Sequence, residues 1–439
     1  NDEKAQSSAR EAYDLLFNLK WTPPGRGLWM MGTEFVHGRG VVEGLSNCAF
    51  SSSSFLSKEY GEYFSWIMEM LMLGVGVGFD VLGAGTPVPG PQTDTLAKYV
   101  IPDTREGWCE SVKLLINSYL KHSPVLVFDY RKIRPAGELI RGFGGVASGP
   151  ASLIELHAEI VTVLDRVSGQ KLTSREITDI CNMIGKCVIA GNVRRSALVG
   201  LAPSNDPFFP DLKNYNLYPE RAAFGWTSNN SILAEVGQNY DKFLDRTWEN
   251  GEPGYVWMHN VHQYARMNKM IDTRDSGALG GNPCLEQPLW HRELCTLSEI
   301  YMNRIRSKSE FTRVLKCAFL YAKSVTLASE RINDSQSREI MTTNRRIGLS
   351  LTGIAQFLGK HSQRTLIDWM EYGYQLSAYY DQLYSQWLDV PESIRRTTIK
   401  PSGSCSLLSG STPGIHFPIS RHYLRRVILP PNSNMLSAL

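Results

Sequence analysis

The sequence predicts an α/β protein built on parallel strands, because short apolar runs alternate with helical patterns along the 439 residues. The composition supports a folded chain, since 42% of the residues are hydrophobic and 20% are charged. Stretches rich in glycine and proline at 83–91 and 142–150 are predicted to be loops, because the alternation continues across them. We therefore predict one principal domain.

The elements follow in a regular order from the N-terminus. Residues 4–20 predict an amphipathic helix, because alanines and leucines recur at helical spacing, and Pro23-Pro24-Gly25 ends it. Beyond it the sequence predicts, in order, an apolar run at 27–31, helix 57–73, strand 77–82, helix 105–120, strand 125–130, helix 173–189, apolar runs at 231–234 and 255–258, helix 311–332, an apolar run at 347–351 and a long helix near 365–388.

Charge and hydropathy exclude two classes of partner. The 46 basic residues nearly balance the 43 acidic ones and form no block, so nucleic acid is not an expected partner. The most apolar stretch, 64–82, contains Glu69 and a glycine-rich run, so no membrane span is expected. The N-terminus has no apolar signal core, and we expect a cytoplasmic protein.

None of the eight cysteines forms a C-x-x-C pair, which argues against zinc ribbons and thioredoxin-type motifs. Four of them, Cys109, Cys181, Cys187 and Cys317, lie in apolar helical patterns and are expected in the core. No metal site is expected, because the histidines lack companions at ligand spacing; His259, His262 and His291 are expected at the surface.

Cys284 differs from these four, since it follows the turn signature Gly280-Gly281-Asn282-Pro283. If the chain after the turn is extended, Asn282, Cys284 and Glu286 share one face, and an amide, a thiol and a carboxylate make a plausible catalytic trio. The alternative is a buried loop with a salt-bridged glutamate. Cys295 could reach the same site if the chain reverses between 290 and 292.

Two glycine-containing segments are candidate phosphate sites. The stretch 74–78 resembles a dinucleotide loop only weakly, because it follows a helix rather than a strand. The stretch 400–406 combines glycine and small hydroxyl residues before an apolar pair, which suits an anion, although a plain helix cap with serines explains it equally well.

Taken together, the segments resemble the catalytic chain of ribonucleotide reductases, and most of all the adenosylcobalamin-dependent (class II) kind. The likeness includes Asn282-Pro283-Cys284-Leu285-Glu286 and runs in order along nearly the whole chain. Its other segments are 24–33, 47–48, 76–79, 102–108, 142–150, 190–196, 228–231, 250–254, 344–348 and 398–403.

The resemblance implies a ten-stranded α/β barrel, in which two halves of five parallel strands run antiparallel around a central finger loop carrying the catalytic cysteine. An N-terminal helical segment would span 1–24 and the catalytic barrel 25–439. Neither an N-terminal nucleotide-binding control domain (ATP-cone) nor a C-terminal swinging cysteine pair is seen.

The resemblance also assigns catalytic roles. Cys284 would form the thiyl radical that removes the C3′ hydrogen of the ribonucleotide, with Glu286 as general base on the 3′-hydroxyl and Asn282 holding the substrate. Cys48 and Cys295 would be the dithiol that becomes a disulfide in each turnover.

Further positions would bind nucleotides. The family motifs place Asn47 and Gly76 at the substrate, and Asn192, Arg194 and Arg195 in the loop that couples a deoxynucleotide or ATP effector to base choice. The loop expected to hold substrate phosphates comprises Ser402, Gly403, Ser404, Cys405 and Ser406.

Adenosylcobalamin is the expected radical source. The alternative is a separate metal-containing subunit, which relays a radical through paired tyrosines near the C-terminus. The only such pair, Tyr379-Tyr380, lies inside a predicted helix. Leu285 replaces the glycine usual in cobalamin enzymes. A nucleotide-binding regulator without catalysis is the third hypothesis.

Two expectations concern partners. The segment 80–98 is short where monomeric cobalamin enzymes carry an insertion that mimics a dimer's effector site, so a homodimer is expected. Because this sequence shows no C-terminal cysteine pair, we expect either that an external thioredoxin-like protein reduces the disulfide directly or that a tail is missing from the sequence.

Overall fold

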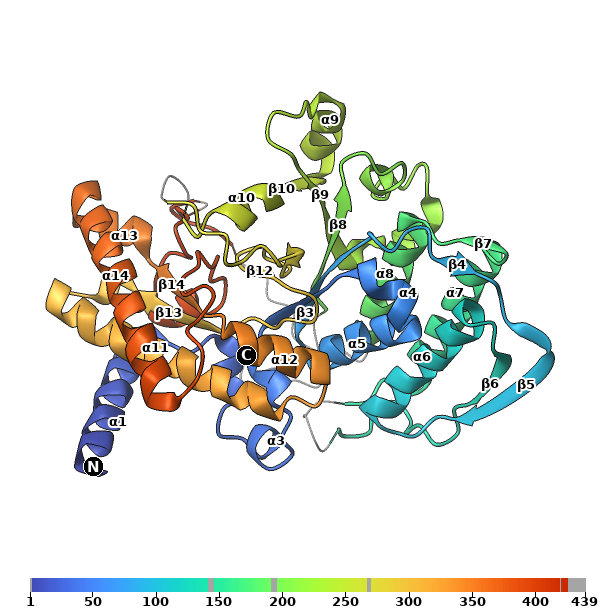
Figure 1. The fold of residues 1–439 in the computed structure, drawn as a ribbon, viewed down its shortest axis with the longest axis horizontal. Helices are drawn as coiled ribbons and strands as arrows, with labels where there is room; N and C mark the ends of the chain where they lie inside the picture. The colour runs from blue at the N-terminus through green and yellow to red at the C-terminus, as the bar shows by residue number, and fades with distance from the viewer. Residues whose placement is uncertain (1, 141–145, 191–195, 267–269, 419, 425–439) are drawn as a thin grey trace.

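The computed structural model describes residues 2–140, 146–190, 196–266, 270–418 and 420–424. Figure 1 shows an elongated molecule. One end holds α1 (Asp2–Phe17), α11 (Lys308–Ala328) and α14 (Gln363–Leu388), and the other holds α6 (Arg105–Leu120) and α7 (Ala151–Arg166). The predicted helices at 4–20, 105–120, 311–332 and 365–388 are confirmed to within a few residues.

A five-stranded sheet in the order β10-β9-β8-β3-β2 lies at the centre, and every neighbouring pair in it is parallel. This confirms the predicted α/β class. The strands are β2 (Cys48–Ser51), β3 (Gly76–Asp80), β8 (Leu198–Pro203), β9 (Ser228–Leu233) and β10 (Gly254–Val256).

The two faces of this sheet pack against different elements. Val77 and Phe79 of β3 join the large core formed with α5 (Gly61–Met72) and α8 (Ser174–Ile189). Because successive side chains of a strand point to opposite faces, Gly76 and Gly78 lie on the other face. That face is left free for a loop that approaches the backbone closely.

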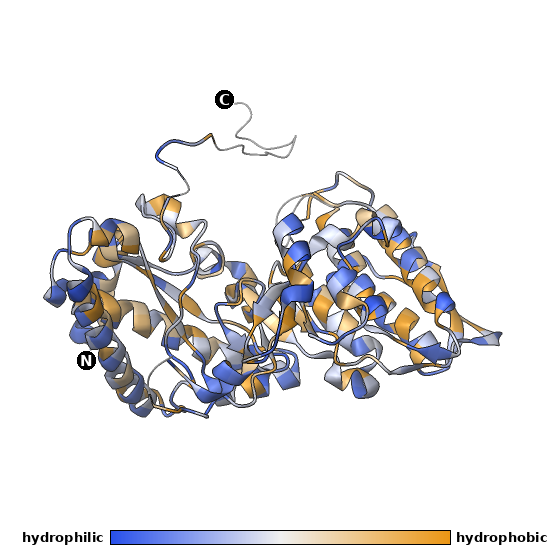
Figure 2. Ribbon diagram, turned by 90° about the horizontal axis from the view of Figure 1, so that it is seen from above, coloured by the Kyte–Doolittle hydropathy of each residue, from blue (hydrophilic) through white to orange (hydrophobic). Residues whose placement is uncertain are grey.

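A second sheet of three strands has the order β1-β13-β14, formed by β1 (Trp21–Thr22), β13 (Leu297–Tyr301) and β14 (Gly348–Thr352). β13 and β14 are parallel, and a parallel bridge joins Leu349 to Thr397. Helices α1, α11 and α14 cover this sheet with their own hydrophobic cluster. Figure 2 shows α1, at the N-terminus, as largely hydrophilic, and Leu15 is its one buried residue.

The two sheets meet along β2, where Ala49 forms an antiparallel bridge with Leu294, just before β13. This bridge is the contact between the two sheets that the structure shows. The ten-stranded barrel is not confirmed, because the described part of the second half contributes only β13, β14 and the bridge at Thr397 as parallel elements. Between β14 and Thr397 the chain forms helices and an irregular segment. Neither adds a further parallel strand.

The strand predicted at 125–130 exists as β6 (Pro124–Asp129), but it lies outside the main sheet. It pairs only with β5 (Gln92–Val100), in a two-stranded parallel sheet at one end of the molecule (Figure 1). The expectation that the main alternation runs through this region is therefore wrong. The apolar run at 27–31 is likewise not a strand, since α2 (Gly25–Met30) occupies it.

No helix of the described ranges is long and apolar enough to cross a membrane.

The remaining helices and strands are short connections. They are α3 (Glu34–His37), α4 (Leu56–Glu59), β4 (Pro87–Val88), β7 (Gln170–Lys171), α9 (Asp241–Asn250), α10 (Met258–Gln263), β11 (Gly280–Gly281), β12 (Pro288–Leu289), α12 (Ser335–Asn344), α13 (Ile354–Leu358) and α15 (Cys405–Ser409).

Candidate active site

A hairpin, which we call the finger loop (residues 280–289), carries Cys284 at its tip. β11 and β12 form its two sides, with Gly280 opposite Leu289 and Gly281 opposite Pro288. It packs on the glycine face of β3, where a Cβ on Gly78 would overlap the carbonyl oxygen of Gly281. A larger residue at position 78 would therefore push the finger loop off the sheet.

The tip of the finger loop is a turn, not the extended segment that the sequence suggested. The N–H of Leu285 donates to the carbonyl of Asn282 at 2.7 Å, and Leu285 has a φ of +56°. Asn282 and Glu286 still meet, because the Asn282 amide donates to a Glu286 carboxylate oxygen, while Asn282 Oδ1 accepts the N–H of Gln287 at 2.9 Å. The grouping of these two residues is confirmed, although the periodicity that suggested it is absent.

Cys284 is the one exposed cysteine of the eight, all of which lie in the described ranges. Loss of hydration, with smaller effects of Glu286 and Cys48, raises the pKa of its thiol to about 11, and Lys400 opposes this shift. At neutral pH the sulfur therefore keeps its hydrogen. A thiol, unlike a thiolate, has a hydrogen atom to lose to a radical.

Cys48 and Cys295 form a buried pair of free thiols beneath the finger loop. The N–H of Cys48 donates to Sγ of Cys295 at 3.1 Å, and the N–H of Cys295 donates to the carbonyl of Cys48 at 2.8 Å. The hydrogen bond to Cys295 and burial raise the pKa of Cys48, and the charge on Glu286 adds to this, whereas a hydrogen bond with Asn282 lowers it. The pair thus lies in contact with Asn282 of the candidate trio that the sequence suggested.

Two charged residues of this site have positions that the sequence did not predict: Glu299 was not named at all, and Lys400 was named only as the start of the candidate phosphate stretch 400–406. Leu297 and Glu299 lie on one side of β13 and Cys295 lies two residues before its start, so a strand prediction there would have pointed to Glu299 on the side of Cys295. Glu299 is fully buried, and its Oε1 lies 3.6 Å from Nζ of Lys400. They give the site a buried ion pair.

The expected phosphate loop divides into buried and exposed residues. Ser402, whose φ is +49°, donates its hydroxyl to Glu299, and Ser406 donates to the carbonyl of Ser402. Cys405 is also buried, so Gly403 and Ser404 are the exposed members of this loop.

Asn47 and Gly76 lie at the edge of the same site. Asn47 Oδ1 is buried without a hydrogen-bond partner in the described residues. A Cβ on Gly76 would lie 3.2 Å from Pro283, so this glycine admits the finger loop to β3. The expected specificity residues Asn192, Arg194 and Arg195 lie outside the described residues.

The expectation that His291 is a surface residue is wrong. Its Nδ1 accepts the N–H of Ser52 at 3.1 Å, its Nε2 lies 2.9 Å from a carboxylate oxygen of Glu59, and its ring stacks on Phe55. Across the described residues, no three His, Cys, Asp or Glu side chains are grouped as a metal site.

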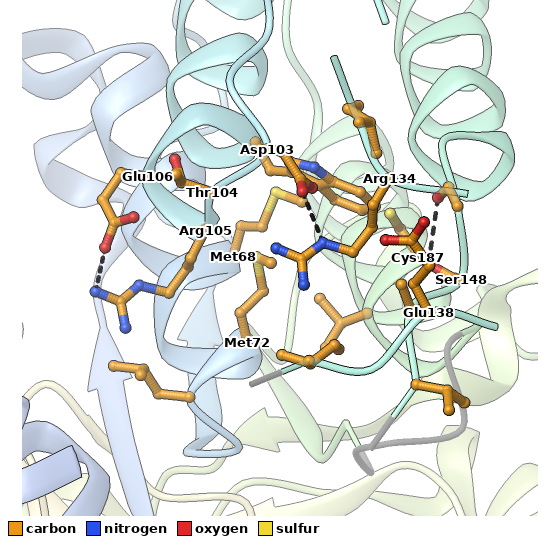
Figure 3. Close-up of a pocket in the computed structure, with 18 of the residues that line it drawn as sticks. Met68, Met72, Asp103, Thr104, Arg105, Glu106, Arg134, Glu138, Ser148 and Cys187 are labelled. Carbon is orange, nitrogen blue, oxygen red and sulfur yellow. Dashed lines mark hydrogen bonds and ion pairs between the residues drawn. The ribbon is translucent and has the colours of Figure 1, made fainter. Parts of the chain in front are cut away.

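A cavity with a volume of about 880 Å³ lies away from Cys48, Cys284 and Cys295 (Figure 3). Met68 and Met72 of α5 contribute apolar lining, and Figure 3 shows Arg134 paired with Asp103, both of which also line the cavity. Cys187, near the end of α8, also lines it, and the chain leads from there directly into the expected specificity loop.

Comparison with known families gives two matches. Residues 87–164 match the family model "B12-dependent ribonucleotide reductase, insertion domain", and residues 1–33 match "Ribonucleotide reductase alpha domain". The first match contradicts the expectation that the chain lacks the insertion of the monomeric enzymes. The insertion comprises β4, β5, α6, β6 and most of α7, and the sequence-based argument for a homodimer loses its premise.

Individual relatives are similar over nearly the whole chain. A probable adenosylcobalamin-dependent ribonucleoside-triphosphate reductase of Dictyostelium discoideum and the corresponding enzyme of Euglena gracilis are each 44% identical, over 100% of this chain and 60% of their own length. The enzyme of Lactobacillus gasseri is 32% identical over 99% of this chain and 69% of its own length. The chain thus spans 60% of the length of the first two relatives.

A solved structure shares the fold. The crystal structure of a B12-dependent (class II) ribonucleotide reductase superimposes with a TM-score of 0.84 at 29% sequence identity, covering 94% of this chain and 68% of the other.

Proposed function

Because this chain belongs to the adenosylcobalamin-dependent (class II) ribonucleotide reductases, we propose that it converts ribonucleoside triphosphates to 2′-deoxyribonucleotides. The observation that carries the proposal is the arrangement of three free thiols in one site. Cys284 is exposed at the tip of the finger loop, and the buried Cys48 and Cys295 lie beneath that loop. The named relatives act on triphosphates, which favours these over diphosphates as substrates.

In the proposed reaction each residue has one task. The thiyl radical of Cys284 takes the hydrogen atom from C3′ of the ribose, and Glu286 accepts the proton of the 3′-hydroxyl. The 2′-hydroxyl takes up a proton and leaves as water. Cys48 and Cys295 supply two electrons and two protons and become a disulfide, and Cys284 then returns its hydrogen atom to C3′. Ribonucleotide and dithiol thus give deoxyribonucleotide, disulfide and water.

The hydrogen bond between Asn282 and Glu286 explains how the base is held ready. It fixes the carboxylate beside Cys284, so that the hydrogen atom and the proton can leave neighbouring positions of one ribose. Residue Asn47, with its unpartnered buried oxygen, is proposed to bind the substrate from the side of β2. Gly403 and Ser404 are the exposed part of the loop proposed for its phosphates.

Adenosylcobalamin would supply the radical that oxidises Cys284. The chain fits this group in one respect, because the thiol that must be reached is the exposed one and the other seven are buried. Pro283 and Leu285 flank that thiol and would lie against the cofactor.

The test is anaerobic turnover of the isolated chain with adenosylcobalamin, dithiothreitol and a ribonucleoside triphosphate, with deoxynucleotide as the readout. We expect product from the wild type and none from Cys284→Ser. Cys317→Ser, a change of a thiol buried in α11, is the matched control and should retain turnover. Product formed only with a separate metal-containing subunit would refute the cobalamin assignment, and nucleotide binding without any turnover would favour a regulator.

We further propose that the cavity of about 880 Å³ holds the deoxynucleotide or ATP effector. Its lining combines an apolar wall with Arg39, Arg105 and Arg134, which suits a base and a triphosphate, and part of it comes from the matched insertion. The double change Arg39→Gln and Arg134→Gln should weaken dATP binding at least about tenfold, with Arg313→Gln on α11 as control. Unchanged binding would refute this site.

The thioredoxin-like reductant, the homodimer and the cytoplasmic location stay predictions. Sedimentation of the chain with and without dATP tests the homodimer, and a monomer under both conditions would agree with an insertion that replaces the dimer's effector site.

A further inference from the structure

Lys400 is held rigidly between the two parts of the candidate active site. Its N–H donates to the Ser350 hydroxyl of β14 at 2.9 Å. Two residues earlier in the chain, the hydroxyl of Thr398 donates to the carbonyl of Glu286. The N–H of Thr398 donates to the carbonyl of Leu349 at 3.1 Å. The segment therefore joins the finger loop to the second sheet and fixes where the Lys400 side chain starts.

The ammonium group of Lys400 lies inside the site rather than in solvent. Its side chain is 13% exposed, and Nζ lies 3.6 Å from Oε1 of Glu299, whose side chain is 0% exposed. That oxygen has no hydrogen-bond partner among the described residues, whereas the other carboxylate oxygen accepts the hydroxyl of Ser402. The buried carboxylate gives the cation a fixed counter-charge.

Besides Glu299, the charges that act on this ammonium belong to the candidate active site. Burial lowers the pKa of Lys400, but Glu299, Cys295, Glu286 and Cys48 together raise it above its ordinary value. Lys400 in turn opposes the rise in the pKa of Cys284. The lysine therefore stays charged, and the charges of both thiols of the pair act on it.

We propose that Lys400 is a positioning residue for the dithiol. The ammonium group of Lys400 stabilises the thiolate that leaves when the Cys48–Cys295 disulfide is reduced. The inference rests on the proposed function, since it takes the disulfide from that reaction cycle. Glu299 keeps the ammonium in place, so the two residues act together.

The step balances with an external dithiol as reductant. A thiolate of the reductant attacks one sulfur of the disulfide, the S–S bond breaks, and its electron pair leaves on the other sulfur as a thiolate. The second thiol of the reductant then displaces the remaining cysteine and closes a new disulfide. Two protons pass from the reductant to Cys48 and Cys295. A thiolate whose thiol has a lower pKa is a better leaving group and departs faster. A neighbouring ammonium group lowers that pKa.

The test follows the disulfide without cobalamin. In a Cys284→Ser background, the pair is oxidised, and its reduction by dithiothreitol is timed by alkylation and peptide mass spectrometry. We expect the double variant Lys400→Met, Glu299→Gln to be reduced about tenfold more slowly than the parent, as for a leaving thiolate whose pKa rises by one to two units. The double variant removes both charges, so no buried carboxylate is left unpaired. Lys400→Arg should restore most of the rate.

A matched control separates charge at the site from loss of a buried ion pair. Lys323 and Asp381, which are both 0% exposed and 2.8 Å apart between α11 and α14, are replaced in Lys323→Met, Asp381→Asn. This variant should reduce at the parent rate, even if it unfolds more easily.

Three outcomes decide the matter. Equal rates for the parent and the Lys400/Glu299 double variant, or an arginine variant as slow as the double variant, would overturn the role of Lys400. Failure of Cys48 and Cys295 to form a disulfide at all would instead overturn the proposed function.

Discussion

Arg346 donates from both terminal nitrogens to Asp275, at 2.6 and 2.7 Å, and its Nε lies 2.9 Å from Glu293. The side chains of all three residues are fully buried. Asp275 precedes the finger loop and Glu293 follows it, so one arginine fastens both ends of the hairpin that presents Cys284.

Arg346→Met should destabilise the protein by about 3–5 kcal/mol, because buried Glu293 loses its arginine and buried Asp275 keeps only Arg395, at 3.5 Å. Urea unfolding followed by circular dichroism measures this loss. Arg346→Lys should lose less, since an ammonium still balances one carboxylate. A methionine variant as stable as the wild type would show that the cluster contributes little to holding the finger loop.

Leu285→Gly should keep or raise stability, by up to about 1 kcal/mol. A non-glycine residue at φ +56° bears a strain of about 1–2 kcal/mol, and the entropy cost of glycine offsets about half of it. The structure thus gives a reason why glycine suits this position. Leu285→Val should unfold at lower urea concentration, because branching at Cβ worsens the same strain. A glycine variant less stable than the valine variant would contradict this account.

Alkylation of Cys284 by iodoacetamide should be slow at pH 8 and rise steadily toward pH 11, since its pKa lies at about 11. Glu286→Gln should shift the profile to lower pH, because it removes a negative charge that disfavours the thiolate. The rates are read from the Cys284 peptide by mass spectrometry. A midpoint near the ordinary cysteine pKa would show that the thiol is not held protonated.

His157 should make the protein less stable in acid. It is buried between Ser111 and Tyr130, whose hydroxyls lie 3.0 and 2.7 Å from its ring nitrogens, and burial lowers its pKa to about 3. Between its ordinary pKa near 6.5 and about 3, the unfolded chain binds a proton that the folded one does not. Stability is therefore complete above pH 6.5 and falls by up to about 1.4 kcal/mol for each unit below it.

Thermal unfolding of the wild type and of His157→Gln between pH 7 and pH 4 checks this. The glutamine cannot titrate, so its disadvantage should shrink as the pH falls. A constant difference between the two proteins would assign the acid sensitivity to other groups.

Part of the site was determined by the sequence. The thiol Cys284 between Asn282 and Glu286, and the partners Cys48 and Cys295, were named from local motifs and from the family resemblance. Most of the long helices were also predicted, because apolar residues at a period of 3.6 mark them directly, but α7 (Ala151–Arg166) was missed. The turn at the finger tip was not, since its left-handed Leu285 has no local signal.

Other features were decided by the tertiary structure alone. β2, β8 and β13 are short and wholly or mostly buried, and such strands carry no alternating pattern, so β8 was missed although it lies in the middle of the sheet. β6 was predicted as a strand but assigned to the wrong sheet, because pairing depends on where distant segments pack.

The ion pair of Glu299 and Lys400 shows the same limit most clearly. The two residues are about a hundred positions apart, and their 3.6 Å contact exists only because β13 and β14 lie side by side and carry the segment after Thr397 along with them. A sequence determines which chemical groups are available. Which of them share one low-dielectric space is decided when the strands pair and exclude water from between them.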